Sequence, residues 1–320
     1  MTAEIDPSDG HEPSNPAGRS RRAFLGTAAA AAGAAAVAGG ATIPAQAASA
    51  ATAPPRRRFV DQVVLITGAT SGIGEATARA FAAEGARVSF CGRREALGQQ
   101  VEREIRKRGG KAKYIKADVR VPEQVERFVA ETVREFGRLD IAFNNAGITI
   151  TGPAHELTLE QWTDVQDTNV RGVFLAIKHE APAMLKSGGG VIICTTSESR
   201  RPGGAAYTAS KQAIKGIVDA ASMDYGPQGI RVNAIAPGTT DTAFVRPAGI
   251  PDADWEAFKA AWGPRNVAAL ERMATPDEIA RSVLALATDD FSYQAGSTVL
   301  VGGAPFGGAR MVPVPGFPGG

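Results

Sequence analysis

From Phe59 onward the sequence alternates short apolar runs with longer amphipathic segments, and this alternation constrains the fold more than any other feature. The apolar runs lack strict alternation of apolar and polar residues, as expected for parallel strands that are buried on both faces. Regular alternation of strands and helices predicts a doubly wound α/β fold with right-handed crossovers. The expected strands are 62–67, 87–92, 112–119, 139–147, 190–196, 230–237 and 297–302.

The segments between these strands read as helices. Thr158 and Gln161 form a capping box, and Thr275 precedes Pro276 and Glu278 in a second helix-start pattern. No internal repeat or linker interrupts the chain between Phe59 and Val301, so residues 59–304 are expected to form a single domain. The expected helices are 74–85, 95–109, 122–137, one starting at about 158, 207–225 and 276–287.

The N-terminal segment has the organisation of an export leader. Arg21 and Arg22, followed by Phe24 and Leu25, precede an Ala/Gly run that ends in the small residues around Ala47. This segment resembles the twin-arginine class of bacterial signal peptides, which as a class carry folded proteins out of the cytoplasm. The run is too weakly apolar for a stable membrane span, and Ala and Gly on all sides argue against an amphipathic surface helix.

These observations predict a division of the termini. Residues 1–47 are expected to be a signal peptide, 48–58 a linker and 305–320 a Gly/Pro-rich tail. The expected location is the periplasm or the outside of a bacterium, or the cytoplasm if the leader is not used. The formal net charge of +2 gives no reason to expect nucleic acid as a partner. His155 and His179 stand apart from any Cys/His cluster, so no metal site is expected.

The segment TGATSGIG lies between the first strand and the first helix and contains Gly68, Gly72 and Gly74. A pyrophosphate group needs backbone N–H groups at close range with no Cβ in the way, and a helix N-terminus adds partial positive charge. The spacing differs from the usual G-x-G-x-x-G fingerprint, so an ordinary glycine-rich turn is the alternative.

The segment YTASK places Tyr207 and Lys211 on one face of a helix. An ammonium group close to a tyrosine stabilises the phenolate and lowers a pKa that is otherwise near ~10. Such a tyrosine can act as a general acid or base. Taken alone, a Tyr and a Lys at this spacing are usually surface residues.

The order of these motifs, with NNAG at 144–147, Asn169, Ser197, YTASK and then Pro237-Gly238, resembles the short-chain dehydrogenase/reductase family from Phe59 to Val301. The resemblance implies a Rossmann-like seven-stranded parallel sheet, a nicotinamide cofactor, a homodimer or homotetramer, and interconversion of a secondary alcohol and a ketone. The alternatives are a non-catalytic dinucleotide-binding protein on the same fold and the epimerase and dehydratase branch, for which the chain has little room.

By this resemblance, Tyr207 exchanges a proton with the substrate oxygen, Lys211 binds the nicotinamide ribose and lowers the tyrosine pKa, and Asn169 holds a water in a proton relay. Ser197 would hydrogen-bond the substrate carbonyl. Ser197 precedes Tyr207 by ten residues, a shorter interval than is usual in the family, and the usual interval would fall on Cys194. Thr196 and Ser199 therefore remain alternative hydroxyl donors.

The resemblance also implies a set of cofactor contacts. Asp118 and Val119 would meet the adenine, and Asn145, Ala146 and Gly147 would support the sheet beside the cofactor. The complete expected set is Thr67, Gly68, Ser71, Gly72, Ile73, Gly74, Arg93, Asp118, Val119, Asn145, Ala146, Gly147, Tyr207, Lys211, Pro237, Gly238 and Thr240. At the last strand, Gly302 stands where the family often has Asp, a change expected to affect packing more than chemistry.

Gly92 occupies the place where a carboxylate would bind the free ribose hydroxyls of NAD. Arg93 follows it and can pair with a 2′-phosphate, so NADP is favoured over NAD. Alternatively, Arg93 and Arg94 simply begin a solvated helix.

In the family's sheet order, Cys91 and Cys194 would lie about 14 Å apart at ~4.8 Å per strand spacing, too far for a disulfide, so free thiols are expected. Residues 239–273 correspond to the family's substrate lid. Four aromatic residues there could line a pocket or serve only packing: Phe244, Trp255, Phe258 and Trp262. The sequence does not identify the substrate.

Overall fold

The computed structural model describes residues 57–199, 201–304, 312, 314 and 315. The expected leader lies outside the described residues, as do most of the expected linker and tail. Seven parallel strands form one sheet in the order β3-β2-β1-β4-β5-β6-β7, which confirms the predicted fold class. The strands are β1 (Val63–Thr67), β2 (Arg87–Gly92), β3 (Lys111–Lys116), β4 (Ile141–Asn144), β5 (Gly190–Thr195), β6 (Ile230–Pro237) and β7 (Thr298–Val301).

The helices agree with the sequence pattern except at two places. The expected capping box is present at Thr158 with Gln161, and the expected helix start at Thr275 forms a second capping box with Glu278. The sequence pattern did not predict α5, which follows a π-helical turn at Asp167–Arg171, or α7, which lies within the expected lid. The α-helices are α1 (Gly72–Ala83), α2 (Glu95–Lys107), α3 (Pro122–Phe136), α4 (Leu159–Gln166), α5 (Gly172–Ser187), α6 (Ala205–Tyr225), α7 (Asp252–Asn266) and α8 (Pro276–Ala287).

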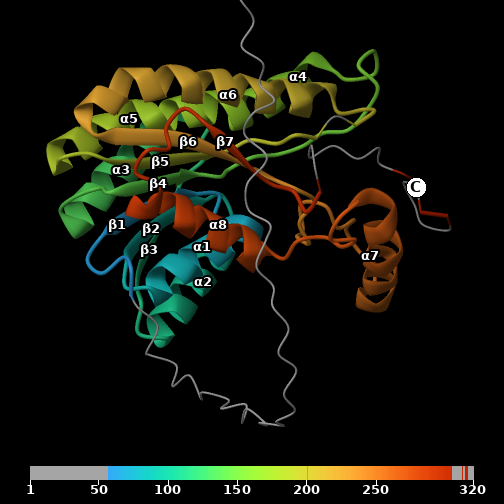
Figure 1. Ribbon diagram of the computed structural model, residues 1–320, viewed down its shortest axis with the longest axis horizontal. Coiled ribbons are helices and arrows are strands. Elements are labelled where there is room, and N and C mark those ends of the chain that lie inside the picture. Colours follow the sequence, from blue (N-terminus) through green and yellow to red (C-terminus); the bar gives the residue numbers. More distant parts are fainter. Residues whose placement is uncertain (1–56, 200, 305–311, 313, 316–320) are drawn as a thin grey trace, which may run out of the picture. The chain divides into compact units, whose positions relative to one another are not determined.

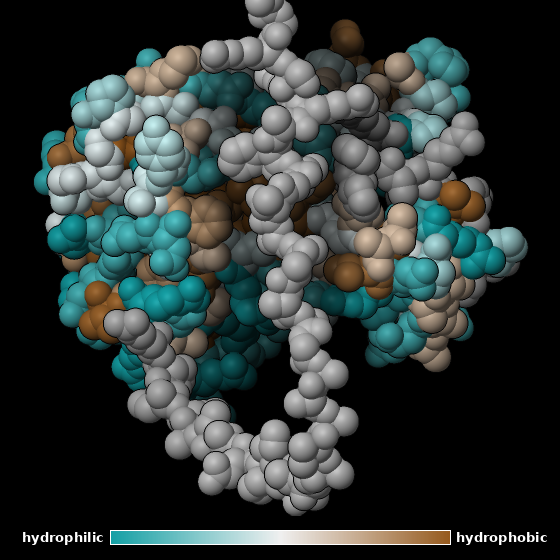
Figure 2. Space-filling view, viewed as in Figure 1, coloured by the Kyte–Doolittle hydropathy of each residue, from teal (hydrophilic) through white to brown (hydrophobic). Residues whose placement is uncertain are grey.

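Helices cover both faces of the sheet (Figure 1). On one face, side chains of α1, α2 and α8, among them Phe81, Ile105 and Val283, pack on β1 and β2. On the other face, side chains of α3, α5 and α6, among them Phe128 and Ile214, form the second part of the core. The outward side of α2 is hydrophilic, as Figure 2 shows, which accounts for its amphipathic sequence.

The order of the sheet reverses at β1, whose neighbours are β2 and β4. In open parallel sheets such a switch point leaves a crevice at the carboxyl ends of the strands, where ligands bind. The loops after β1, β2, β4, β5 and β6 all contribute residues to one cavity of about 780 Å³. The fold therefore brings together at one edge the motifs that are scattered along the sequence.

Cys91 lies on β2 and Cys194 on β5, three strand spacings apart, and both thiols are buried and free, as predicted. Burial raises the pKa of the Cys91 thiol to about 12, so it stays protonated. Within the described residues, no helix combines the length and the apolar character that crossing a membrane requires.

Candidate active site

The glycines of the β1–α1 loop permit close backbone contacts. Gly68 has a φ of +68°, and a Cβ added there would lie 2.7 Å from Cα of Ala146. A Cβ at Gly74 would lie 2.6 Å from the carbonyl oxygen of Gly68. The loop can therefore lie against the 145–147 segment and leave the N-terminus of α1 open to the cavity, as a bound pyrophosphate requires.

Asn145 ties this loop to the end of β4. Its Nδ2 donates to the carbonyl oxygens of Thr67 at 3.3 Å and Gly68 at 3.2 Å. In return, Oγ1 of Thr67 accepts from the backbone N–H groups of Asn145 and Ala146, at 3.0 and 3.1 Å. Thr67 and Gly74 thus lie behind the cavity lining, whereas all the other predicted cofactor residues line the cavity.

Gly92 and the arginines after it lie beside the same loop. A Cβ at Gly92 would lie 2.6 Å from Cγ2 of Thr70, so Thr70 fills the space that a longer side chain would need. Arg94, which the sequence pattern did not single out, donates to Oγ1 of Thr70 at 3.0 Å and to Oγ of Ser71 at 2.5 Å. Arg93 is exposed and lines the cavity.

Asp118 and Val119 line the cavity after β3, as expected for residues near an adenine. The Asp118 carboxylate is paired with Arg120 at 2.6 Å, and Arg120 also contacts Asp164 at 2.5 Å. The hydrogen bonds from Arg120 lower the pKa of Asp118. Its carboxylate therefore stays ionised and already has a partner. Its backbone is engaged as well, because the N–H donates to Oε1 of Gln124 at 2.8 Å and the carbonyl oxygen accepts the N–H of Val121 at 3.0 Å.

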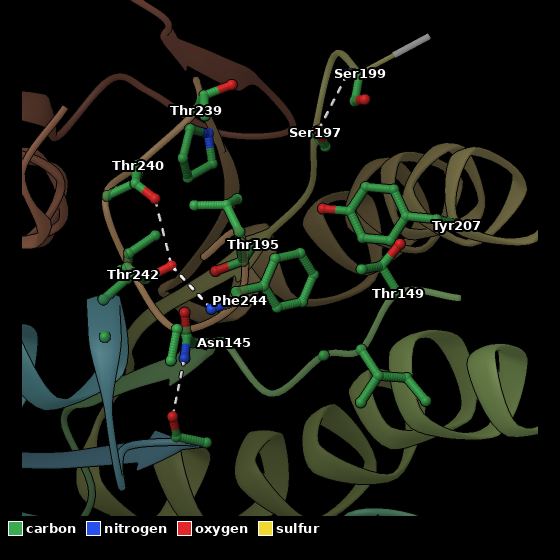
Figure 3. Close-up of a pocket in the computed structure, with 18 of the residues that line it drawn as sticks. Asn145, Thr149, Thr195, Ser197, Ser199, Tyr207, Thr239, Thr240, Thr242 and Phe244 are labelled. Carbon is green, nitrogen blue, oxygen red and sulfur yellow. Dashed lines mark hydrogen bonds between the residues drawn. The ribbon is translucent and has the colours of Figure 1, made fainter. Parts of the chain in front are cut away.

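Tyr207 lines the cavity from the first turn of α6, and Figure 3 shows its hydroxyl pointing into the cavity near Ser197. Burial raises the pKa of Tyr207, while the hydrogen bond with Ser197 and the nearby charge of Arg201 oppose that rise. The Ser197 hydroxyl also accepts the backbone N–H of Ser199 at 3.1 Å. Of the three candidate hydroxyls, Thr196 donates to the carbonyl oxygen of Lys211 at 2.6 Å and is buried in the wall.

Lys211 lies one helical turn beyond Tyr207, with its Nζ 5.7 Å from the centre of the tyrosine ring. The ammonium group is almost fully buried and donates to the carbonyl oxygen of Thr195 at 2.8 Å. Burial lowers the pKa of Lys211 to about 8. The four-residue spacing thus places the ammonium beneath the tyrosine ring, whereas the charge that acts on the pKa of Tyr207 is that of Arg201.

Asn169 lies behind the cavity wall, in the π-helical turn between α4 and α5, and is fully buried. Its Oδ1 accepts the backbone N–H of Ile148 at 2.8 Å, and its Nδ2 donates to the Ile148 carbonyl oxygen at 3.0 Å and to Oγ of Ser210 at 2.9 Å. Asn169 therefore connects the loop after β4 to α6. A single π turn of this kind is frequent at functional sites.

The loop after β6 closes the other side of the cavity, where Figure 3 shows Thr239, Thr240 and Thr242 across from Tyr207. Backbone packing is tight here, because a Cβ at Gly238 would lie 2.7 Å from the Gly302 carbonyl oxygen. Gly302 thus allows the close approach of the loops after β6 and β7, in keeping with the expected effect on packing.

A family model described as enoyl-(acyl carrier protein) reductase matches residues 68–303. The chain is 42% identical over 253 residues to an A-factor type γ-butyrolactone 1′-reductase (1S-forming) of Streptomyces virginiae, covering 76% of this chain and 95% of that protein. It is 36% identical to a cyclohexanol dehydrogenase of Acinetobacter sp., covering 77% and 96%. A crystal structure of a short-chain type dehydrogenase/reductase from Mycobacterium marinum superposes with a TM-score of 0.71 at 35% identity, covering 78% of this chain and 96% of that one.

The chain belongs to the short-chain dehydrogenase/reductase family. This short-chain dehydrogenase/reductase is accordingly an NAD(P)-dependent oxidoreductase that acts on CH–OH groups. The cavity fits such a cofactor, because it is lined by Gly68, Gly72 and Ile73 where the glycine-rich loop meets the N-terminus of α1. The comparisons therefore support an enzyme and give no support to a non-catalytic dinucleotide-binding protein.

Four aromatic residues of the expected lid surround the far end of the enzyme's cavity. Trp255 and Trp262 are 2% and 5% exposed and belong to a separate small apolar cluster. Both residues also line the cavity, so they serve packing as well as the cavity wall. Phe258 stacks on Trp255 with ring centres 5.3 Å apart. Phe244 faces Tyr207 across the cavity, with ring centres 6.0 Å apart (Figure 3).

The sequence pattern missed several polar residues of this enzyme. Arg94 adjoins the predicted cofactor residue Arg93, but nothing in the local sequence indicates which of the two arginines faces the cofactor. Arg201, Asp241 and the buried Glu180 each acquire partners more than ten residues away, so no local spacing could identify them.

Proposed function

We propose that Tyr207 is the general acid and base of a reaction that interconverts a secondary alcohol and a ketone. The observation that carries this proposal is the arrangement of its hydroxyl, which points into the cavity, is hydrogen-bonded to Ser197 and lies above the buried Lys211. When bound, the nicotinamide supplies or accepts the hydride. Because burial raises the pKa of Tyr207, the phenol holds its proton at neutral pH and can donate it to a carbonyl oxygen.

Ser197 and Lys211 support the tyrosine in this proposal. Ser197 accepts the Ser199 N–H and is hydrogen-bonded to Tyr207, so its hydroxyl lies beside the reactive phenol, where it can also meet the substrate oxygen. Lys211, with a pKa of about 8, is mainly protonated at neutral pH and favours the phenolate that forms when the proton leaves. Asn169 holds the loop at Ile148 in position. Because both polar atoms of its side chain are already bonded to Ile148, a relay water would have to bind the carbonyl oxygen of Ile148 or displace one of these contacts.

NADP is the cofactor that the site favours in this proposal. Thr70 leaves no space at Gly92 for the carboxylate that would select NAD. Arg93 and Arg94 both line this end of the cavity, and Thr70 and Ser71 hold the Arg94 guanidinium. Two cations with no carboxylate at this position favour a 2′-phosphate.

The substrate class proposed here is an alicyclic ketone or the corresponding alcohol. The relatives include a γ-butyrolactone reductase and a cyclohexanol dehydrogenase. Aromatic side chains at the far end of the cavity, Phe244, Trp255, Phe258 and Trp262, supply apolar surface that suits a ring.

The test uses the purified enzyme with NADPH and cyclohexanone, and with NADP⁺ and cyclohexanol, followed at the nicotinamide absorbance. General acid–base catalysis contributes about 10²–10⁴-fold, so Tyr207→Phe should lower kcat by about that factor. Tyr293→Phe is the matched control, because Tyr293 is fully exposed. Unchanged turnover in Tyr207→Phe would refute the assigned role.

Export through a twin-arginine pathway is part of the proposal. Arg21 and Arg22 lie outside the described residues, and their sequence context supports the assignment. Because this pathway carries folded proteins, the nicotinamide can be bound before export, and an exported enzyme should then hold it tightly or regenerate it with paired substrates. Replacing both arginines with lysine should retain the enzyme in the cytoplasm; continued export would contradict the assignment.

A homodimer or homotetramer is also proposed. Leu159 and Trp162 on α4 and Phe174 on α5 are 79%, 41% and 54% exposed, which is unusual for large apolar side chains. Sedimentation of the wild-type enzyme and of Phe174→Ser measures this: a monomeric wild type would contradict the proposal.

A further inference from the structure

Arg201 lies in the loop between β5 and α6, and two threonines from the loop after β4 hold its side chain. Its Nη2 donates to Oγ1 of Thr149 at 3.2 Å and to Oγ1 of Thr151 at 3.1 Å. All three residues line the cavity, and Figure 3 shows Thr149 beside the Tyr207 ring. The guanidinium is thus held at the same end of the cavity as the reactive tyrosine.

The guanidinium of Arg201 has N–H donors that its two threonine contacts do not use. A guanidinium carries five N–H groups, and the Nε and Nη1 groups of Arg201 have no acceptor within residues 57–199 and 201–304. None of the ion pairs found there includes Arg201, whereas arginines such as Arg79, Arg120 and Arg272 are each paired with carboxylates. Arg201 is therefore a half-buried cation whose described contacts are neutral hydroxyl groups.

The charge of the surrounding cavity is positive at this end. Asp118 is the only carboxylate among the lining residues that the structure describes, and it lies at the opposite, adenine end, already paired with Arg120. The charged side chains nearest to the reaction centre are Arg201 and Lys211. The influence of Arg201 reaches the tyrosine, because its charge favours the phenolate form of Tyr207.

We propose that Arg201 binds a carboxylate carried by the substrate, so that the physiological substrate is an anionic ketone or hydroxy acid rather than a neutral one. This inference rests on the proposed function, because it assigns a substrate group at the same site. A carboxylate would supply the missing counter-charge and accept from the unused guanidinium donors. The two threonines fix the plane of the guanidinium in advance, which lowers the entropy lost when an anion binds.

The experiment measures binding by calorimetry to the full-length enzyme loaded with NADP⁺. The two probes are cyclohexanecarboxylate and cyclohexanecarboxamide, which have the same ring and nearly the same shape but differ in charge. We expect the wild type to bind the acid about tenfold or more tightly than the amide, as charge-assisted hydrogen bonds imply. Arg201→Met should reduce this ratio to near one, and Arg201→Lys should restore part of it, because it returns the charge without the planar fork.

Arg134→Met is the matched control, because Arg134 is an exposed arginine on α3 that is remote from the cavity lining. Its acid-to-amide ratio should equal that of the wild type. A wild-type ratio near one, no binding of either probe, or a preference that survives Arg201→Met would each overturn the inference. A purely structural role for Arg201, joining the two loops, would weaken both probes equally and leave the ratio unchanged.

The proposed function is tested separately by turnover of cyclohexanone in the wild type and in Tyr207→Phe. Turnover that depends on Tyr207 without any carboxylate preference would reject the inference and keep the proposed function. A carboxylate preference that depends on Arg201, with turnover that is insensitive to Tyr207, would reject the catalytic role of the tyrosine and keep the anion site.

Discussion

Glu180 on α5 is a fully buried carboxyl group that touches Asn144 on β4. Nδ2 of Asn144 donates to Oε2 of Glu180 at 2.8 Å. The other two oxygens of this pair, Oε1 of Glu180 and Oδ1 of Asn144, are both buried without a partner among the described residues. A proton on Glu180 would allow the carboxyl group to donate to the amide oxygen and satisfy both atoms. Burial raises the pKa of Glu180 to about 8, in keeping with a protonated acid at neutral pH.

The Glu180→Gln variant should lose less stability than the wild type as the pH rises. The folded-state pKa of about 8 lies above the ordinary value, so the contribution of the neutral acid is complete below about pH 4 and is lost as the pH rises through 8. The loss in the wild type should approach about 1.4 kcal/mol per pH unit within that window. Glutamine has the same shape, cannot ionise, and can make both hydrogen bonds to Asn144.

Urea denaturation between pH 5 and pH 8.5 measures the free energy of unfolding of both proteins. Glu126→Gln, at an exposed position of α3, controls for the removal of a carboxyl group at the surface. Parallel curves for the wild type and Glu180→Gln would mean that Glu180 is not a buried neutral acid.

At the scale of the element, the carboxylate of Asp241, in the loop after β6, makes two contacts with α7. Oδ1 of Asp241 accepts the indole N–H of Trp255 at 2.7 Å, and Oδ2 accepts from the Lys259 ammonium. Trp255 is almost completely buried, so its N–H depends on this acceptor. Asp241 thus joins the lid helix to the loop that follows Pro237 at the end of β6.

Asp241→Ala should loosen α7 and weaken substrate binding. Leaving a buried donor unpaired costs about 1–3 kcal/mol, and α7 carries three of the aromatic residues at the substrate end of the cavity. We expect faster amide hydrogen exchange across 252–266 and a higher KM, with a smaller change in kcat. Asp252→Ala is the control, because Asp252 pairs with Arg246 while 92% of its side chain is exposed. Unchanged exchange in α7 of Asp241→Ala would show that Asp241 does not hold this helix.

The elements also show what the sequence could and could not predict. The strands, α8 and both capping boxes depend on local patterns, which remain visible in a single sequence. The sequence pattern does not predict α5 for two reasons. A π turn before its first residue shifts the helical register, and Pro182 in its interior would normally indicate the end of a helix. Within the site, Tyr207 and Lys211 follow from helical spacing, whereas the environments of Arg201, Asp241 and Glu180 depend on contacts between distant segments.

At the scale of the whole molecule, the cavity is built from loops of both halves of the sheet. Gly68, Arg94 and Asp118 follow β1, β2 and β3, whereas Ser197 and Thr240 follow β5 and β6. A dinucleotide that contacts both sets can bind well only when the sheet is complete. Cofactor binding should therefore stabilise the fold as a unit, by mass action on the native state.

This coupling gives a test of cofactor preference that does not need the substrate. A cofactor at 100 times its Kd stabilises the native state by about 2.7 kcal/mol, which for a domain of this size raises Tm by several degrees, at about 2–4 °C per kcal/mol. At equal concentrations, NADP⁺ should raise Tm more than NAD⁺. Arg94→Ala should reduce the NADP⁺ effect while leaving the smaller NAD⁺ effect nearly unchanged, because only the 2′-phosphate loses its cation. Arg103→Ala, at an exposed position of α2, is the matched control. Equal shifts with the two cofactors, or a larger shift with NAD⁺, would reverse the preference that Gly92 and the two arginines indicate.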